Sequence, residues 1–373
     1  MKILVVSSWD GGGVSTAISN IAAPLSERGV SYSAFGFHGW NPNTRWAGFC
    51  DRLYSGLEIT LAELLVREHF DVVHLVDTAC GPTYHMNQWL SRARYRGGVV
   101  CMSQNAISEV APDQRADVFV ACSQGSRKVM AQTIVRPIRV IYNGVDTDKF
   151  RPVPVEKPPR PIVLWVGRAL DTKQKDTSGF FYVVANLLDA DTDFVLVDGG
   201  SHFDELRIRD WFGERVRYES NLSFDQLVVL YSQVAASGGA MLSTSTFEGL
   251  PFVMVEAAAC GCPLVAPRAN GLEWIQDDDI GLTYERESAL RGVLECLQQL
   301  KDPQLRQSLV SRSQAAIART YNSRTMAEGY YQAYLDAIEA SQDAPPETWR
   351  DRVARCAWAS ALRLRHARRR GAK

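Results

Sequence analysis

The sequence predicts an α/β protein of two doubly wound domains that face a central cleft, followed by a C-terminal helical extension. Three observations support this fold class. Short β-branched runs alternate with helix-period segments over the first 300 residues, and a proline-rich segment (151–161) interrupts the alternation. The 373 residues also exceed the usual ceiling of about 250 to 300 for one core. We therefore place the domains at residues 1–152 and 153–322, and the C-terminal helices, crossing back toward the first domain, at 323–373.

The strands of the first domain are expected at near-continuous apolar runs. Such runs are typical of a parallel sheet that helices cover on both faces. Between them, the apolar spacing predicts helices such as 14–28 and 57–69. The expected strands are KILVV (2–6), DVVHLV (71–76), GVVCM (98–102) and ADVFVAC (116–122).

The second domain begins after the segment RPVPVEKPPRP, which holds five of the sixteen prolines and predicts a stiff linker. Beyond it the alternation restarts, and residues 286–341 have a helical pattern. In open sheets of this kind, ligands bind outside the carboxyl ends of the strands, so we expect a ligand between the domains. The expected strands are IVLWVGR (162–168), DFVLVDGG (193–200) and GGAMLS (238–243).

Composition narrows the function classes. With 46% apolar residues, 22% charged residues and a net charge of −1, the chain has the composition of a soluble globular protein, and no global charge indicates nucleic acid. The N-terminal apolar run ends at Val6, too soon for a signal peptide or a membrane span. The eight cysteines form no Cys-x-x-Cys pair, which is typical of buried free thiols and predicts a reducing cytoplasm.

The last 25 residues, 349–373, are strongly basic. They hold eight arginines and one lysine against one aspartate, with tryptophans and aliphatic residues interleaved. Two interpretations stay open. The segment makes peripheral contact with the anionic surface at the inner face of a membrane, or it is a terminal helix that packs on the body and exposes a basic face to solvent.

A glycine loop, WDGGGVSTAISN, follows the first expected strand and opens a helix. Such a loop lets backbone approach a phosphate closely. It is not the dinucleotide fingerprint, because Thr16 occupies the third glycine position after Gly11 and Gly13, and the second strand has no acid at its end. A nicotinamide enzyme is therefore disfavoured. No Gly-Lys-Ser/Thr follows, so a nucleotide hydrolase of the P-loop type is disfavoured too.

Two glutamates, Glu248 and Glu256, flank Pro251 in the segment TFEGLPFVMVEAAACGCPLVA (246–266). Because proline suits the first turn of a helix, Glu248 is expected in the preceding loop and Glu256 about one and a half turns into the helix. Both then lie near a helix terminus that attracts anions. The alternative is a capping box formed by Ser245 and Glu248, with Glu256 merely facing solvent.

Basic residues follow the first strand of the second domain, in VGRALDTKQK. Arg168 comes directly after the strand, with Lys173 and Lys175 close behind. Cations at this position suit a diphosphate, and arginine can bind it through two parallel hydrogen bonds. Carboxylates beside a phosphate site repel the ligand unless they accept hydrogen bonds from its hydroxyls. A sugar nucleotide offers such hydroxyls on both its ribose and its hexose.

The order of these motifs resembles a known family. VIYNGVDTDKFRP (140–152), VGR…K (166–173), the Glu-x7-Glu segment with Ala-Cys-Gly-Cys-Pro, and NGLEWIQDDDIGLTY (270–284) look like the large retaining glycosyltransferase family of GT-B fold. That family includes sucrose synthases and many bacterial mannosyl- and glucosyltransferases. The resemblance extends to about residue 335, is strongest in the second half, and implies two Rossmann-like domains.

The resemblance implies roles for individual residues. Glu256 would hold the ribose hydroxyls and Glu248 the hydroxyls of the donor sugar, while Arg168 and Lys173 would neutralise the diphosphate. Arg168, Lys173 and Glu248 are therefore also the main catalytic candidates. The remaining donor-binding candidates are Leu222 at the base, backbone N–H groups near Phe252 and Val253, and Gly12 and Gly13 from the first domain.

The acceptor side departs from the family pattern. Many members carry a histidine after the fourth strand of the first domain, but here Ser103 or Gln104 stands in its place, so either is a catalytic candidate. His38, His74 and His85 are fallbacks. Aromatic and apolar residues expected on loops of this domain suit a sugar ring or an apolar aglycone. These residues are Trp9, Phe37, Trp40, Trp46, Tyr84 and Met86. The acceptor candidates are Trp9, Trp40 and Tyr84 from this set, together with His38 and His85.

The predicted function is transfer of a sugar from a nucleotide-diphosphate sugar to an acceptor hydroxyl, with retention of the anomeric configuration and with UDP favoured over GDP. The acceptor would be a carbohydrate, a lipid-linked or a natural-product molecule, in glycan or glycoconjugate biosynthesis. The family needs no metal and no cofactor, so Asp277-Asp278-Asp279 is interpreted as a turn cluster. Two alternatives stay open: a sugar-nucleotide epimerase of the same fold, and a non-catalytic nucleotide-sugar-binding scaffold subunit.

Overall fold

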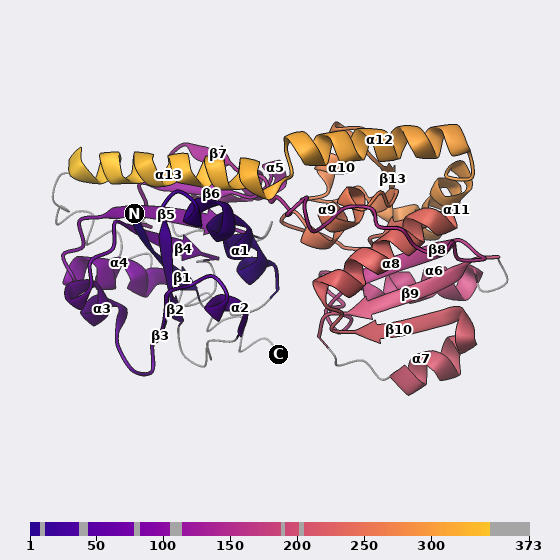
Figure 1. The fold of residues 1–373 in the computed structure, drawn as a ribbon, viewed down its shortest axis with the longest axis horizontal. Coiled ribbons are helices and arrows are strands. Elements are labelled where there is room, and N and C mark those ends of the chain that lie inside the picture. The colour runs from indigo at the N-terminus through magenta and orange to yellow at the C-terminus, as the bar shows by residue number, and fades with distance from the viewer. Residues whose placement is uncertain are drawn as a thin grey trace.

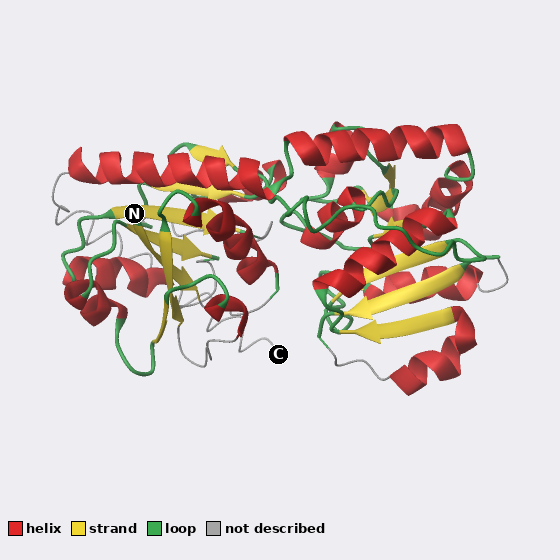
Figure 2. Cartoon of the chain, in the orientation of Figure 1, coloured by secondary structure: helices red, strands yellow, loops and turns green. Residues whose placement is uncertain are grey.

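Two parallel β-sheets, each covered by helices, form the body of the protein (Figure 1). The computed structural model describes residues 1–7, 12–36, 44–77, 83–104, 114–187, 191–200 and 205–343. In both domains the strands lie between helices on the two faces (Figure 2). The predicted fold class is therefore confirmed.

The first sheet has seven strands within the described residues, in the order β3-β2-β1-β4-β5-β6-β7, and every neighbouring pair is parallel. Each predicted strand of this domain is present to within two residues at either end. The strands are β1 Lys2–Ser7, β2 Ser31–Gly36, β3 Arg52–Ser55, β4 Val72–Val76, β5 Gly98–Ser103, β6 Val118–Ala121 and β7 Ile138–Val140.

The second sheet has six strands within the described residues, in the order β10-β9-β8-β11-β12-β13, again all parallel. The proline-rich linker lies between the last strand of the first sheet and the first strand of the second. The strands are β8 Ile162–Gly167, β9 Asp193–Asp198, β10 Val216–Ser220, β11 Ala240–Leu242, β12 Leu264–Pro267 and β13 Leu282–Tyr284.

Helices connect the strands and cover both sheets. The helices that precede the second sheet are α1 Gly13–Ser26, α2 Thr44–Ala47, α3 Leu61–Arg67, α4 Thr83–Arg92 and α5 Gln124–Met130. Those after β8, the first strand of the second sheet, are α6 Thr177–Leu187, α7 Glu205–Phe212, α8 Phe224–Ser237, α9 Phe252–Ala259, α10 Glu273–Asp277, α11 Ala289–Gln299, α12 Pro303–Arg319 and α13 Ser323–Asp343, with short 3-10 turns at Gly213–Arg215 and Arg286–Ser288.

Each sheet has one point at which the strand order reverses. In the first sheet it lies between β1 and β4, and in the second between β8 and β11. The connections on the two sides of such a point leave on opposite faces of the sheet, which opens a crevice at the carboxyl ends of the strands. In sheets of this kind, a crevice at such a point is where ligands bind.

The long helix α13 returns the chain to the first domain. It packs against α1 and β5 and lies along that domain, whereas α12 covers the second (Figure 1). The chain therefore crosses between the domains twice, and the crossings touch. Val145 forms a parallel bridge with Asn322, supported by hydrogen bonds from Val145 N–H to the Tyr321 carbonyl (2.9 Å) and from Ser323 N–H to the Val145 carbonyl (2.8 Å).

A buried histidine marks the contact between α13 and the first sheet. His74, in the middle of β4, has no exposed surface, and its Nδ1 lies 2.9 Å from the hydroxyl of Tyr334 on α13. The ring of Tyr330 packs beside it with centroids 5.4 Å apart. Burial lowers the pKa of His74 to about 3. His74 was a fallback catalytic residue, and the structure corrects this: the side chain is a neutral packing group beneath α13.

This burial predicts a specific loss of stability in acid. The folded-state pKa of His74 lies below its usual value near 6.5, so the unfolded chain binds the extra proton, and stability is complete above pH 6.5 and falls as pH drops toward 3. Between pH 6.5 and pH 5 the histidine should cost about 2 kcal/mol. Urea unfolding of wild type and His74→Gln at both pH values measures it. An equal pH dependence in the two proteins would contradict the assignment.

Candidate functional site

The reversal point of the second sheet brings together two loops from distant parts of the sequence. Hydrogen bonds join the loop after β8 (168–176) to the residues after β11. They include Thr246 N–H to the Gln174 carbonyl (2.7 Å), Thr246 Oγ1 to the Lys173 carbonyl (2.6 Å), and Thr244 Oγ1 to the Lys175 carbonyl (2.9 Å). A narrow cavity of about 10 Å³ remains there. Its lining includes Lys175, Ser243, Ser245, Glu248, Pro251, Val253 and Met254.

Glu248 is the centre of this site. Its carboxylate accepts hydrogen bonds from Lys175 Nζ (2.6 Å), Ser245 Oγ (2.6 Å) and Gln174 Nε2 (3.1 Å), and the residue is only 5% exposed. The capping-box alternative is wrong, because α9 begins at Phe252 with Pro251 as its N-cap, well beyond Ser245. The structure instead holds a buried, charge-assisted carboxylate in the loop that precedes the helix.

Lys175, rather than Lys173, is the lysine that reaches Glu248. The side chain of Lys175 is 14% exposed, whereas Lys173 is exposed. Arg168 is about half exposed and pairs with Asp171 at 2.6 Å. Lys175 belonged to the basic segment noted in the sequence but was not chosen as a site residue. Two lysines two residues apart in a loop carry no periodicity, so nothing in the sequence distinguishes the inward one.

Glu256 lies about one and a half turns into α9, as the sequence predicts. It is 4% exposed, so the alternative in which it faces solvent is wrong. Its Oε2 accepts a hydrogen bond from the hydroxyl of Tyr231 on α8 (3.3 Å). Burial, followed by the charge of Glu256, holds the pKa of Tyr231 well above its usual range, so this hydroxyl stays a donor. Leu222 lies half-buried between β10 and α8.

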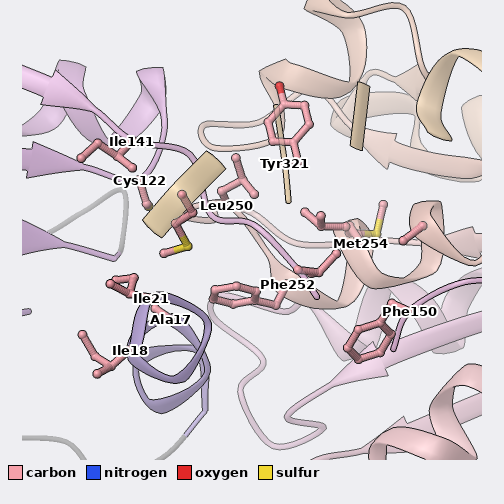
Figure 3. Packing of buried hydrophobic residues seen from close by; sticks show 14 of the residues in the cluster. Ala17, Ile18, Ile21, Cys122, Ile141, Phe150, Leu250, Phe252, Met254 and Tyr321 are labelled. Carbon is pink, nitrogen blue, oxygen red and sulfur yellow. The ribbon is translucent and has the colours of Figure 1, made fainter. Parts of the chain in front are cut away.

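Two helix N-termini from different domains meet beside this site. Gly12 is the N-cap of α1 with φ +64°, and a Cβ on Gly13 would lie 3.7 Å from the ring of Phe252, the first residue of α9. Figure 3 shows Phe252 directed toward α1. The first N–H groups of a helix have no intrahelical acceptor and carry partial positive charge. With Lys175 nearby, the junction is suited to an anion.

The first-domain edge of the junction is formed by the ends of β4 and β5. Ser103, the last residue of β5, is buried, and the side-chain amide of Gln104 exchanges hydrogen bonds with that of Asn143 (2.8 and 3.0 Å). Gln104 N–H donates to Asp77 Oδ1 at 2.9 Å. Burial raises the pKa of Asp77 to about 6, so this carboxyl changes charge near neutral pH. The sequence analysis did not select Asp77. Its position directly after an apolar strand was the feature that could have marked it as a site residue.

Most acceptor candidates lie outside the described residues. Trp9, Phe37, His38 and Trp40 belong to that set, and for Tyr84 and His85 only the backbone is described, in α4 rather than in a loop. Two further loop predictions are wrong: Trp46 lies in α2 with no exposed surface, and Met86 lies in α4 at 2% exposure. Both are apolar residues that the helices bury against the core.

The aspartate cluster at the end of α10 is engaged with other parts of the chain. Asp278 accepts a hydrogen bond from the Tyr321 hydroxyl, and Asp279 pairs with Arg312 at 3.2 Å. Within the described ranges, no group of three or more His, Cys, Asp or Glu side chains is arranged to hold a metal ion. The six described cysteines are free, and all but Cys50 are buried.

The basic segment 349–373 lies outside the described residues. Among the helices that are described, none combines the length and the apolar character that crossing a membrane requires.

The fold defines a structural class of protein. The two facing domains have the GT-B fold, shared with solved structures over almost the whole chain. Sucrose-phosphate synthase from Thermosynechococcus elongatus superposes with a TM-score of 0.71 at 17% identity, covering 91% of this chain and 99% of that one. Anabaena Alr3699/HepE in complex with UDP-glucose gives 0.71 at 18% identity, covering 89% and 98%.

Sequence comparison adds a family match for the second domain. Residues 160–301 match the model of the family "Glycosyl transferases group 1". The N-acetyl-alpha-D-glucosaminyl L-malate synthase of Bacillus anthracis is 28% identical over 108 residues, 29% of this chain and 28% of that protein. The GDP-mannose-dependent alpha-(1-6)-phosphatidylinositol monomannoside mannosyltransferase of Mycobacterium tuberculosis is 26% identical over 192 residues, 46% and 49%. The chain thus matches about a quarter to a half of these relatives' length.

The buried ion pair at Glu248 predicts different effects for two neighbouring lysines. Lys175→Met should lower the free energy of unfolding by about 3 kcal/mol, because it leaves a buried carboxylate without its cation. Lys173→Met, two residues away and exposed, is the matched control and should change it by no more than about 0.5 kcal/mol. Urea unfolding at pH 7.5 measures both. Equal effects of the two substitutions would show that the pair does not form.

Proposed function

We propose that the protein is a retaining, metal-independent glycosyltransferase that moves a sugar from a nucleotide-diphosphate sugar, UDP favoured over GDP, to an acceptor hydroxyl. The observation that carries the proposal is the pair Glu248 and Glu256, both buried, on the two sides of the N-terminus of α9. The match of residues 160–301 to group 1 glycosyltransferases and the likeness to a structure described with UDP-glucose support it.

In this proposal each part of the site binds one part of the donor. Glu256, deep in α9 beside Tyr231, accepts hydrogen bonds from the ribose hydroxyls, and Glu248 accepts them from the sugar. The diphosphate binds where the N-termini of α1 and α9 meet, with Lys175 as the neighbouring cation. Arg168 and Lys173 lie further out on the same loop and remain candidates for the outer phosphate oxygens.

In the proposed reaction, the leaving diphosphate accepts the proton of the acceptor hydroxyl. The acceptor oxygen forms a bond to the anomeric carbon on the face from which the diphosphate leaves, the bond from that carbon to the phosphate oxygen breaks, and the hydroxyl proton passes to the leaving phosphate oxygen. Charge develops on the diphosphate, next to Lys175 and the helix N-termini. Preorganised contacts of this kind are worth on the order of 10² to 10³ in rate each.

Nucleotide binding provides the first test. In a thermal-shift panel of UDP, GDP, dTDP and NAD with excess EDTA, we expect stabilisation by one diphosphate nucleotide. A ligand at about 100 times its Kd stabilises by roughly 2.7 kcal/mol. Glu256→Gln should weaken UDP binding about tenfold and leave pyrophosphate binding unchanged. Glu248→Gln should weaken the UDP-sugar relative to UDP itself. Isothermal titration calorimetry measures each constant.

The same preparations provide a control variant and distinguish the alternative functions. Glu295→Gln, an exposed glutamate paired with Arg291, should leave every constant unchanged. Absence of binding by all the nucleotides, or an equal loss for UDP and pyrophosphate in Glu256→Gln, would contradict the proposed site. Tight nucleotide binding without hydrolysis or transfer of any donor would favour a scaffold protein, and conversion of the donor sugar without acceptor would favour an epimerase.

We also propose that residues 349–373 hold the enzyme on an anionic membrane surface, where a lipid-linked acceptor would lie. The support is the charge of the segment and its interleaved tryptophans. Sedimentation with vesicles of phosphatidylcholine and phosphatidylserine should recover the full chain in the pellet at low salt, and a chain ending at residue 348 should stay in the supernatant. Equal sedimentation of the two chains would contradict this proposal.

A further inference from the structure

The loop that carries Glu248 into α9, residues 248–251, lies against the first domain. On its own side, Glu248 N–H donates to the Asn270 carbonyl at 2.8 Å, and a Cβ on Gly271 would lie 1.8 Å from the Glu248 carbonyl oxygen. The turn at Gly271 in turn contacts α5 of the first domain, because a Cβ on Gly125 would lie 2.7 Å from Gly271 N. The backbone of Glu248 is therefore enclosed.

Two side-chain amides of the first domain hold the other side of this loop. Asn143, 1% exposed, donates from Nδ2 to the Leu250 carbonyl at 2.9 Å. The same amide exchanges hydrogen bonds with Gln104, at 2.8 Å from Asn143 Nδ2 and 3.0 Å from Gln104 Nε2. Gln104 is itself anchored through its backbone N–H on Asp77. A continuous chain of hydrogen bonds thus connects the end of β4 with the residue before the N-cap of α9.

Close packing fixes the same contact. A Cβ on Gly249 would lie 2.0 Å from the Gln104 carbonyl oxygen and 3.0 Å from Cys122 Sγ. The φ of Gly249 lies outside the left-handed region, so the glycine is needed for the approach of the two domains and not for its own conformation. Figure 3 shows Leu250 and Cys122 neighbouring one another at this junction.

We propose that Asn143 and Gln104 are positioning residues that fix Glu248 from across the domain boundary. We name the contact of Gln104, Asn143, Gly249 and Leu250 the interdomain clasp. Its catalytic consequence rests on the proposed function. Because Glu248 is two residues from Leu250, a shift of the first domain moves the carboxylate that receives the donor sugar. The amide of Gln104, a catalytic candidate from the sequence, then acts through Glu248 rather than on the substrate.

The test removes the clasp without touching the donor site. Asn143→Leu keeps the size of the side chain but leaves the Leu250 carbonyl and the Gln104 amide without their partner. We expect kcat for the UDP-sugar to fall about 100-fold, since a misplacement near 1 Å costs that much, while the Kd for UDP, whose diphosphate contacts the loosened N-terminus of α9, weakens by no more than about tenfold. Gly249→Ala, which forces the domains apart with one methyl group, should give the same split.

A matched control separates positioning from folding. Asn87 is also a buried asparagine whose amide oxygen accepts from a glutamine, Gln114, at 3.2 Å, but both lie within the first domain. Asn87→Leu should lower the Tm and leave kcat unchanged. In the swap Gln104→Asn with Asn143→Gln, which preserves the total length of the pair, kcat should recover at least tenfold relative to Asn143→Leu.

Hydrogen exchange makes the outcome independent of turnover. In Asn143→Leu and Gly249→Ala, the amides of residues 249–254 should exchange at least tenfold faster than in wild type, and in Asn87→Leu they should not. Unchanged exchange there, or unchanged kcat in both clasp variants, overturns the clasp. If wild type turns over no nucleotide sugar, the proposed function fails, and the exchange rates alone decide whether the clasp exists.

Discussion

The buried carboxylate of Glu248 is the constraint on which the site depends. A carboxylate out of water needs a cation and hydrogen-bond donors, and the fold supplies Lys175 and Gln174 from a loop more than 70 residues earlier in the chain. That supply is possible because β8 and β11 are neighbours at the point where the strand order reverses. The same topology that opens a crevice for a ligand therefore also assembles the charges that line it.

The site sets opposite charges at short range. The N-termini of α1 and α9 and the ammonium of Lys175 favour an anion, while Glu248 and Glu256 favour hydroxyl donors. A ligand that is anionic in its middle and rich in hydroxyls at both ends satisfies all of these groups. A bare phosphate or a neutral sugar satisfies only part of them. In the proposed function, the arrangement therefore discriminates by the order of chemical groups along the donor.

The sequence predicted the features that depend on local pattern. Runs such as KILVV and IVLWVGR became central strands, because a strand buried on both faces must be apolar throughout. The edge strand β3, with Arg52 at its start, gave no such run. The positions of Glu248 before the helix and of Glu256 within it were predicted from the place of Pro251. The choice between Lys173 and Lys175 was not, because it depends on hydrogen bonds from Thr244 and Thr246, which lie far along the chain.

The return of α13 to the first sheet has a consequence for biosynthesis. The second domain is an insertion whose two connections are hydrogen-bonded together at Val145 and Asn322. As the chain leaves the ribosome, the first sheet emerges early, but the helix that covers β5 and His74 emerges only after the whole second domain. Domains fold as units, with N-terminal ones usually first. Here the first domain completes its packing only after residues 323–343 have emerged. Until then, the apolar face that α13 covers has no helix over it.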